Sequence, residues 1–223
     1  MKRALLSWSG GKDCAWALER LRGSDIEIAG LLTTINEQSD RVAMHGVRRE
    51  LIEEQARATG IPLWITPLPW PCPNQQYERI MAGVCARALR QGIQATVFGD
   101  LFLEDIRAYR ERALAGTGLE PLFPLWGAPT AALAREMLAG GLKLRVVCAD
   151  TKVLDASFAG REFDTTFLSD LPLGADPCGE NGEFHTFVYD GPMFRQPVAI
   201  ETGAVREEGG FAFADFMCPV SSL

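Results

Sequence analysis

One short stretch near the start of the chain constrains the fold more than any other. A mainly apolar run at positions 4–8 is followed by Gly10, Gly11 and Lys12, and apolar residues then recur at helical spacing up to position 21. This pattern predicts a strand, a tight turn and a helix. In that arrangement the backbone N–H groups of the turn and the helix N-terminus point at one place, where they bind an anion.

Each residue type in this turn suits a phosphate. The two glycines allow positive φ angles and a close approach of the backbone to a ligand. Lys12 adds a positive charge, Ser9 adds a hydroxyl group, and we expect Asp13 to cap the following helix. The spacing is not that of the Walker A loop or of the Gly-x-Gly-x-x-Gly turn. An ordinary glycine turn with an incidental lysine is the alternative, which the flanking strand and helix disfavour.

Composition narrows the class of protein. The chain has 223 residues, a formal net charge of −7 and a sequence pI of about 5.0, which argues against broad nucleic-acid binding. Its six cysteines form no C-x-x-C pair and it has only two histidines, so we expect reduced thiols and no zinc site. No apolar run is long enough to cross a membrane and no signal segment is visible, which predicts a cytoplasmic protein.

Strands alternate with helices over the first 120 residues. This alternation predicts an α/β fold with a doubly wound parallel sheet, of the Rossmann-like or HUP-like kind. Ligands of such sheets bind beyond the carboxyl ends of the strands. We therefore expect the 9–13 loop to lie near Thr33 and Thr34, at the end of the second strand, and near Asp100, at the end of the fourth. Strands are predicted at 26–34, 61–65 and 95–99, with helices at 47–59, 75–90 and 104–114.

The second half of the chain has a different pattern. The Pro-rich residues 121–127 predict a rigid connector, followed by a helix at 130–139 and strands at 142–148 and 184–188. A Glu-Glu-Gly-Gly turn between residues 204 and 213 indicates a hairpin. We expect two domains, residues 1–126 and a smaller C-terminal α+β domain of residues 127–223.

A second stretch, residues 176–186, is dense in polar groups. Glu180 and Glu183 are separated by Asn-Gly and lead into the strand predicted at 184–188. Two carboxylates in a glycine-rich turn can hold a cation, orient ammonia or act as a base. A solvated acidic turn explains the same residues, and composition alone favours it.

The two stretches together resemble known families. Residues 9–14, Ser-Gly-Gly-Lys-Asp-Cys, resemble the Ser-Gly-Gly-Lys-Asp-Ser loop of the ATP pyrophosphatases, which split ATP between the α and β phosphates. With the Gly-Glu-Asn-Gly-Glu segment at 179–183, nearly the whole chain resembles the diphthine–ammonia ligase family. The resemblance implies an ATP-dependent ligase that adenylates a carboxylate, releases pyrophosphate and transfers ammonia or a small amine.

The resemblance also assigns roles to individual residues of the two stretches. To these residues we add Thr33, Thr34 and Asp100, which lie at the ends of predicted strands. ATP and Mg²⁺ are the expected cofactors, and no side chain is assigned to the metal. The expected ATP-binding residues are Ser9, Gly10, Gly11, Lys12, Asp13, Cys14, Thr33 and Thr34. The expected substrate-binding residues are Gly179, Glu180, Asn181, Gly182, Glu183, His185 and Thr186. The expected catalytic residues are Lys12, Asp100, Glu180 and Glu183.

Two positions depart from the family pattern. Cys14 replaces the last serine of the loop and supplies a weaker donor. His185 stands where the family has glutamate, in the expected acceptor site. The chain thus resembles a bacterial-type member of this family. The sequence does not specify whether the acceptor is a small molecule or a protein carboxylate.

Two other functions use the same loop. A non-catalytic sensor of adenine nucleotides would keep the loop without turnover, and a tRNA sulfur transferase would need reactive cysteines, with Cys14 the one to test. A homo-oligomer is compatible with the sequence. Among the remaining polar residues, His45 could contact a phosphate, but we expect it in a solvated loop. The arginines at 107 and 110 could bind a polyanion or pair with Glu104 and Glu111, and with Arg112 we expect them on a salt-bridged helix face.

Overall fold

The computed structural model describes residues 1–43 and 45–219, and its first half is built on a parallel sheet, sheet A. Strand β1 lies between β2 and β5, β2 also pairs with β4, and β5 pairs with β6, all in parallel. The short β3 runs antiparallel to the end of β2. The strands are β1 (Lys2–Ser7), β2 (Ile26–Asn36), β3 (Arg41–Val42), β4 (Leu63–Leu68), β5 (Ala95–Val97) and β6 (Glu120–Leu122).

The direction of winding reverses at β1. From β1 the chain passes outward through β2 to β4, and it then returns to the other side of β1 to form β5 and β6. Such a switch point leaves a crevice at the carboxyl ends of the two central strands. The doubly wound parallel sheet expected from the sequence is confirmed, and the loops after β1 and β5 flank its crevice.

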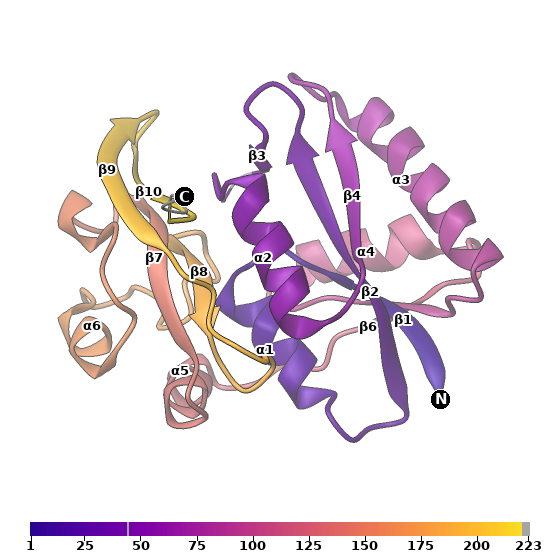
Figure 1. The fold of residues 1–223 in the computed structure, drawn as a ribbon, viewed down its shortest axis with the longest axis horizontal. Helices are drawn as coiled ribbons and strands as arrows, with labels where there is room; N and C mark the ends of the chain where they lie inside the picture. The colour runs from indigo at the N-terminus through magenta and orange to yellow at the C-terminus, as the bar shows by residue number, and fades with distance from the viewer. Residues whose placement is uncertain (44, 220–223) are drawn as a thin grey trace.

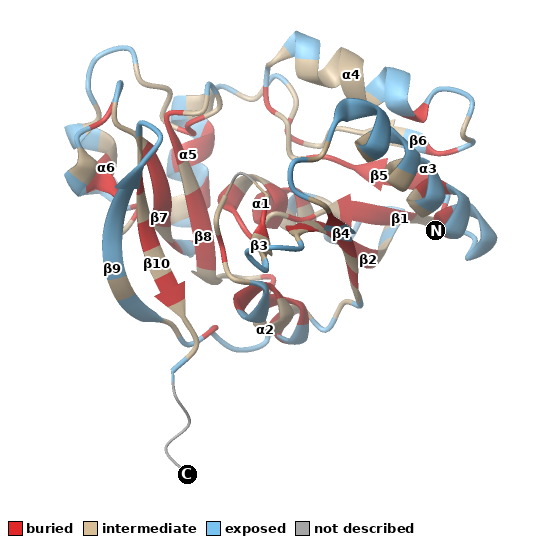
Figure 2. Cartoon of the chain, turned by 90° about the horizontal axis from the view of Figure 1, so that it is seen from above, coloured by how far each residue is buried: buried red, intermediate tan, exposed pale blue. Residues whose placement is uncertain are grey.

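Helices cover both faces of sheet A because side chains alternate along each strand. Ala4 and Leu6 of β1 belong to the core shared with the C-terminal half, whereas Leu5 packs into a smaller core against α3 and α4. Both views place α1 and α2 between sheet A and a second sheet (Figures 1 and 2). The helices are α1 (Lys12–Arg20), α2 (Arg49–Thr59), α3 (Asn74–Arg90) and α4 (Glu104–Leu114).

The second half of the chain forms the antiparallel sheet B, in the order β8-β7-β10-β9. One face of sheet B packs toward α1, and Figure 2 shows its buried strands in red beside that helix. This confirms a smaller C-terminal α+β part, while the exact division at Trp126 stays a prediction. The elements are α5 (Thr130–Ala139), β7 (Lys143–Asp150), the 3₁₀ turn η1 (Ala156–Phe158), α6 (Thr165–Asp170), β8 (Phe184–Asp190), β9 (Glu201–Glu208) and β10 (Phe211–Met217).

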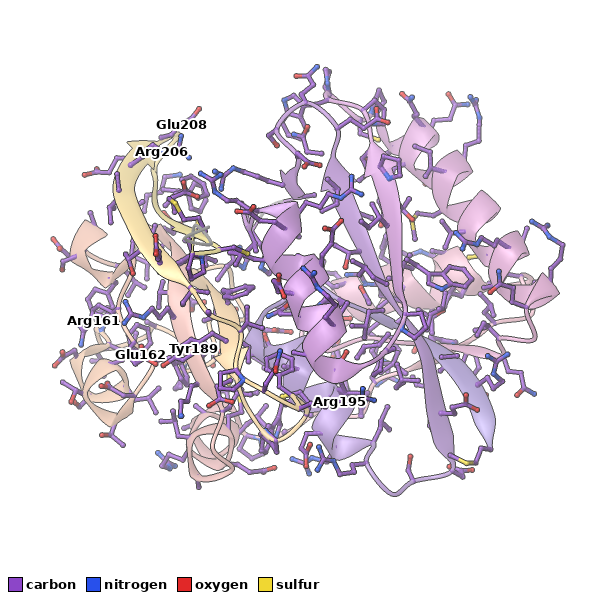
Figure 3. The ribbon with its side chains drawn as sticks, viewed as in Figure 1. Arg161, Glu162, Tyr189, Arg195, Arg206 and Glu208 are labelled. Atoms are coloured by element: carbon purple, nitrogen blue, oxygen red, sulfur yellow. The ribbon has the colours of Figure 1, made fainter. Side chains whose placement is uncertain are left out.

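Polar contacts hold α2 and the loop before it against the C-terminal half. Asp215 of β10 accepts hydrogen bonds from Arg41 at 2.9 Å and from Arg48 at 2.6 Å, and these bonds lower its pKa to about 2. The backbone N–H of Arg195 donates to the carbonyl oxygen of Ala58 at 2.8 Å, near the end of α2 (Figure 3). By contrast, β9 is an exposed edge strand.

The structure corrects three local expectations. Residues 120–122 form the edge strand β6 instead of a connector, which is possible because an edge strand needs no ladder N–H from Pro121. The strand expected at 61–65 is β4, which runs on to Leu68 and includes Pro67, because β4 has a partner on one side only. Asp13 does not cap α1, whose N-cap is Gly11. Within the described residues, no helix is both long and apolar enough to cross a bilayer.

Candidate functional site

The glycine loop joins β1 to α1 and rests on α2. Gly10 has φ = +83°, and a Cβ at this position would lie 2.7 Å from Ile52 Cδ1 and 2.8 Å from Gln55 Oε1. Both the positive φ and the close approach to α2 therefore require glycine here. Gly10 faces α2 and not the pocket, so it shapes the loop from behind.

Gln55 of α2 holds the loop in place. It is completely buried, accepts a hydrogen bond from Trp8 Nε1 at 2.8 Å and donates to the carbonyl oxygens of Gly10 and Val188 at 3.0 and 2.6 Å. A fully satisfied buried amide fixes its neighbours strongly. The sequence analysis missed this residue, although a glutamine within the apolar stripe of a helix was the available signal.

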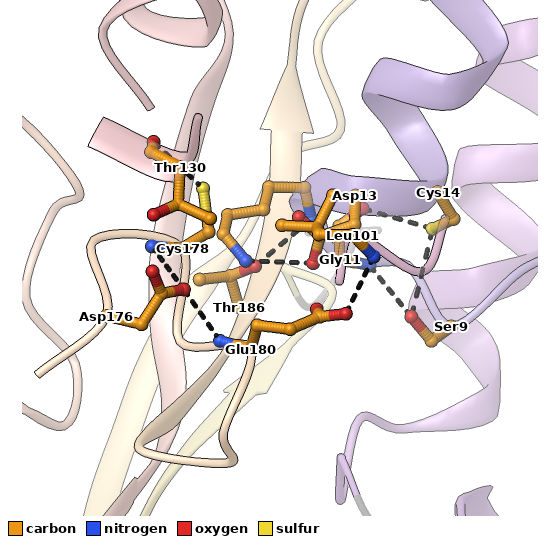
Figure 4. A network of polar contacts seen from close by, with 11 residues as sticks. Ser9, Gly11, Asp13, Cys14, Leu101, Thr130, Asp176, Cys178, Glu180 and Thr186 are labelled. Carbon is orange, nitrogen blue, oxygen red and sulfur yellow. Dashed lines mark hydrogen bonds and ion pairs between the residues drawn. The ribbon is translucent and has the colours of Figure 1, made fainter. Parts of the chain in front are cut away.

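Strand β8 brings the second polar stretch against the loop. The backbone N–H of Lys12 donates to Thr186 Oγ1 at 3.1 Å, and the N–H of Val188 donates to the carbonyl oxygen of Gly10 at 2.9 Å. Glu180 reaches the loop after β5, where its Oε1 accepts from the N–H of Leu101 at 2.7 Å (Figure 4). Two segments about 170 residues apart in the sequence thus form one site.

A pocket of about 260 Å³ opens between these segments. It contains most of the residues expected from the sequence, together with His45, Phe98 and Arg110. The expected residues that line it are Ser9, Gly11, Lys12, Asp13, Cys14, Asp100, Gly179, Glu180, Gly182, His185 and Thr186.

The other expected residues lie outside this pocket. Thr33 is buried and its hydroxyl donates to the carbonyl oxygen of Trp8, whereas Thr34 lines a neighbouring cavity. Glu183 is buried and does not line the pocket; its Oε1 accepts from the N–H of Asp176 at 2.8 Å and from Asn181 Nδ2 at 2.9 Å. These contacts give Glu183 and Asn181 a role in the shape of the turn.

Lys12 is a buried cation at the centre of the site. Its side chain is almost inaccessible, its Nζ lies 2.8 Å from Asp13 Oδ2, and the ring of Phe184 lies 5.5 Å away. Burial opposes the charge, but the neighbouring carboxylates, Asp13 first, outweigh burial and raise the pKa of Lys12. The ammonium group therefore stays charged and in place for an anionic ligand.

Carboxylates surround this cation. Burial raises the pKa of Glu180 to about 7, against the hydrogen bond from Leu101. A Cβ on Gly99 would lie 3.1 Å from Asp13 Cβ, so the loop that carries Asp100 packs directly on Asp13. Asp13 Oδ1 and Asp100 Oδ2 are both buried without a hydrogen-bond partner in the described part of the chain.

The two histidines of the chain meet in the wall of the pocket. The rings of His45 and His185 lie 4.4 Å apart, one contributed by the loop after β3 and the other by β8. Burial lowers the pKa of both, that of His185 to about 4, so both imidazoles are neutral at pH 7. His45 is therefore not the solvated loop residue that the sequence suggested.

The thiols near the site are not activated. Cys14 Sγ donates to the carbonyl oxygen of Gly11 at 3.0 Å, and burial raises its pKa. Burial raises the pKa of Cys178 to about 12. Because the thiolate is the reactive form, neither cysteine suits sulfur transfer.

Glu180 gives a test of this electrostatic picture. The carboxyl group of Glu180 binds its proton more tightly in the folded state, where its pKa is about 7, than in the unfolded state, where the pKa is near 4.5. The stability that protonated Glu180 contributes is therefore fully present below about pH 4.5 and is lost as the pH rises through about 7. We expect Glu180→Gln to raise the Tm relative to the original protein at pH 8 and to change it much less at pH 5. Thermal unfolding at both pH values measures this, and an equal shift at both would contradict it.

Fold and site together define the class of this protein: a doubly wound α/β protein with a glycine-rich, anion-binding loop at its switch point. Comparison with known proteins gives the family. Residues 1–121 match the model of the diphthamide synthase N-terminal domain and residues 129–213 match that of the diphthamide synthase C-terminal domain. The chain belongs to the diphthamide synthase family.

Curated relatives agree with this family over most of their length. The chain is 22% identical to the diphthine–ammonia ligase of Bos taurus, over 92% of this chain and 85% of that protein. It is 23% identical to the diphthine–ammonia ligase of Danio rerio, over 94% and 91%. A solved structure from Methanocaldococcus jannaschii, described as a predicted subunit of tRNA methyltransferase, aligns with a TM-score of 0.47 at 15% identity, over 89% of this chain and 100% of that one.

Proposed function

We propose that this protein is an ATP-dependent, amide-forming ligase of the cytoplasm, which adenylates a carboxylate and transfers ammonia or a small amine to it. One observation carries the proposal: β8 places Thr186 directly against the glycine loop, and Glu180 and His185 line the same pocket as Lys12. A nucleotide bound to the glycine loop would therefore face the residues expected to bind the second substrate. The names of the curated relatives support the same reaction.

The reaction needs no nucleophile from the protein. An oxygen of the acceptor carboxylate attacks the α phosphorus of ATP, the bond to the bridging oxygen breaks, and pyrophosphate leaves with the electron pair. Lys12 is placed to offset the charge that builds on this leaving group, because it is buried and charged. The amine then attacks the acyl carbon of the adenylate, AMP leaves, and an amide remains.

Glu180 is suited to the second step. With a pKa of about 7, a fraction of its carboxyl groups is ionised at neutral pH, and it lies in the pocket beside Asp100. A base of this pKa can accept the proton that the attacking amine loses. His185 faces the same space, so its replacement of the family's glutamate bears on the choice of acceptor.

Magnesium normally accompanies ATP in such a reaction, and two carboxylates fit that role. Asp13 Oδ1 and Asp100 Oδ2, which accept no hydrogen bond from the described residues, are hard ligands of the kind Mg²⁺ prefers. Among the described residues no cluster of three or more metal-binding side chains occurs. These two residues would thus supply part of the shell, with phosphate oxygens and water as the rest, and the ion would neutralise the phosphates.

Product analysis tests the proposal. The protein is incubated with ATP, Mg²⁺, ammonium and, as the source of acceptor, either a desalted cell extract or a pool of small metabolites, and AMP is resolved from ADP. We expect AMP and pyrophosphate in equal amounts. ADP and phosphate would overturn the adenylation mechanism, and tight ATP binding without any turnover would favour a nucleotide sensor.

A further inference from the structure

A second, larger cavity adjoins the pocket. It has a volume of about 900 Å³ and lies between one face of sheet A and the helices α3 and α4. Ser7, Ser9, His45, Phe98 and Arg110 line both the pocket and the cavity, so the two spaces meet at these residues. The cavity wall is largely apolar and includes Leu5, Leu32, Leu68, Met81, Val84 and Leu114.

Arg110 stands at this junction. The sequence predicted that the arginines of α4 form a salt-bridged surface, and Arg107 does so, with its Nε 2.8 Å from Glu111 Oε1. Arg110 differs, because it turns inward to line both spaces and its guanidinium lies 4.9 Å from the ring centre of Phe98. Helix α4 therefore supplies the site with a second cation, in addition to Lys12 of the loop motif.

The bonding of Arg110 is incomplete. Its Nε lies 3.6 Å from Asp100 Oδ2, which is too long for a hydrogen bond, and both atoms are buried without a hydrogen-bond partner among the described residues. Arg48, by comparison, donates to Asp215 at 2.6 Å and 3.0 Å. The guanidinium of Arg110 thus retains donors for an anion in the site.

We propose that Arg110 binds the α phosphate of ATP, and later that of the acyl adenylate, with the adenosine in the apolar cavity. This inference rests on the proposed function. The loop and Lys12 would hold the β and γ phosphates, and the apolar cavity suits a base and its ribose, so the α phosphate falls between them, where Arg110 lies. The α phosphate keeps its charge when pyrophosphate leaves, and Arg110 would hold the adenylate for the second step.

Calorimetric titration of the purified protein with ATP, AMP and pyrophosphate tests this assignment. We expect Arg110→Met to weaken the binding of ATP and AMP by about 10- to 100-fold, because a charge-assisted hydrogen bond is lost. Pyrophosphate binding, which uses the loop alone, should change less than about twofold, a readout that also reports on folding. Arg107→Met, three residues away on the same helix, is the matched control and should bind all three ligands normally.

Two further variants separate the possible failures. Arg110→Lys keeps the charge and should bind AMP better than Arg110→Met, and Ala113→Trp, which narrows the cavity, should weaken AMP and not pyrophosphate. If Arg110→Met binds ATP and AMP as the original protein does, the inference is wrong while the proposed function stands. If the original protein binds neither ATP nor pyrophosphate, both are wrong.

Discussion

Replacing Lys12 with methionine is expected to lower the rate of AMP formation from ATP about 1,000-fold, the largest effect on activity that we predict. Lys12 is a buried cation at the loop, where charge develops on the leaving pyrophosphate. Methionine fills a similar volume and carries no charge, so the variant removes the electrostatic term with little change in packing. The rate is measured in the ammonium and extract assay, and pyrophosphate affinity is measured by calorimetry.

Lys143→Met is the matched control. Lys143 of β7 also forms an ion pair, 2.9 Å from Asp190 Oδ2, but it is exposed and lies outside the site. We expect this variant to keep the activity of the original protein. Unchanged AMP formation by Lys12→Met would refute the role of the loop in pyrophosphate release.

The largest effect on stability is expected at Gln55. Gln55→Leu removes the partner of Trp8 Nε1 and of two carbonyl oxygens, those of Gly10 and Val188, while it leaves those groups buried. An unpaired buried polar group costs about 1–3 kcal/mol, so we expect a loss of about 3 kcal/mol or more in the free energy of unfolding. Urea unfolding measures it.

Gln94→Leu serves as the comparison. Gln94 is exposed and its side chain accepts one hydrogen bond, from the N–H of Arg3 at 3.3 Å. We expect that variant to change stability by less than about 0.5 kcal/mol. Equal stability of Gln55→Leu and Gln94→Leu would show that Gln55 does not hold the loop.

Most elements of the fold could be predicted from local patterns. The helices expected at 104–114 and 130–139 have the observed bounds, because apolar residues recur at helical spacing over several turns. The edge strand at Glu120–Leu122 was missed because its Pro121, with Pro124 just beyond the strand, argues for a loop. Only pairing with β5 makes such a sequence a strand, and pairing is a long-range property.

Local sequence likewise determined the chemistry of the two polar stretches. The glycines and Lys12 follow a strand and begin a helix, and covalent neighbours alone give that geometry. The carboxylates of the 176–186 turn were visible, but nothing local distinguished Glu180, which lines the pocket, from Glu183, which supports the turn. Which carboxylate faces a ligand depends on where β8 packs.

Tertiary structure decided the rest of the site. Burial gives Glu180 a pKa of about 7 and keeps His45 and His185 neutral, and burial is a property of the folded molecule as a whole. Gln55 acts by hydrogen bonds to groups 45 or more residues away in the sequence. Arg110 acts through the cavity that α4 encloses with sheet A. The sequence by itself determined a phosphate-binding loop and its family, because bonded neighbours set that turn. Only the tertiary structure identified the residues that contact this loop, because non-bonded contacts between distant segments bring them together.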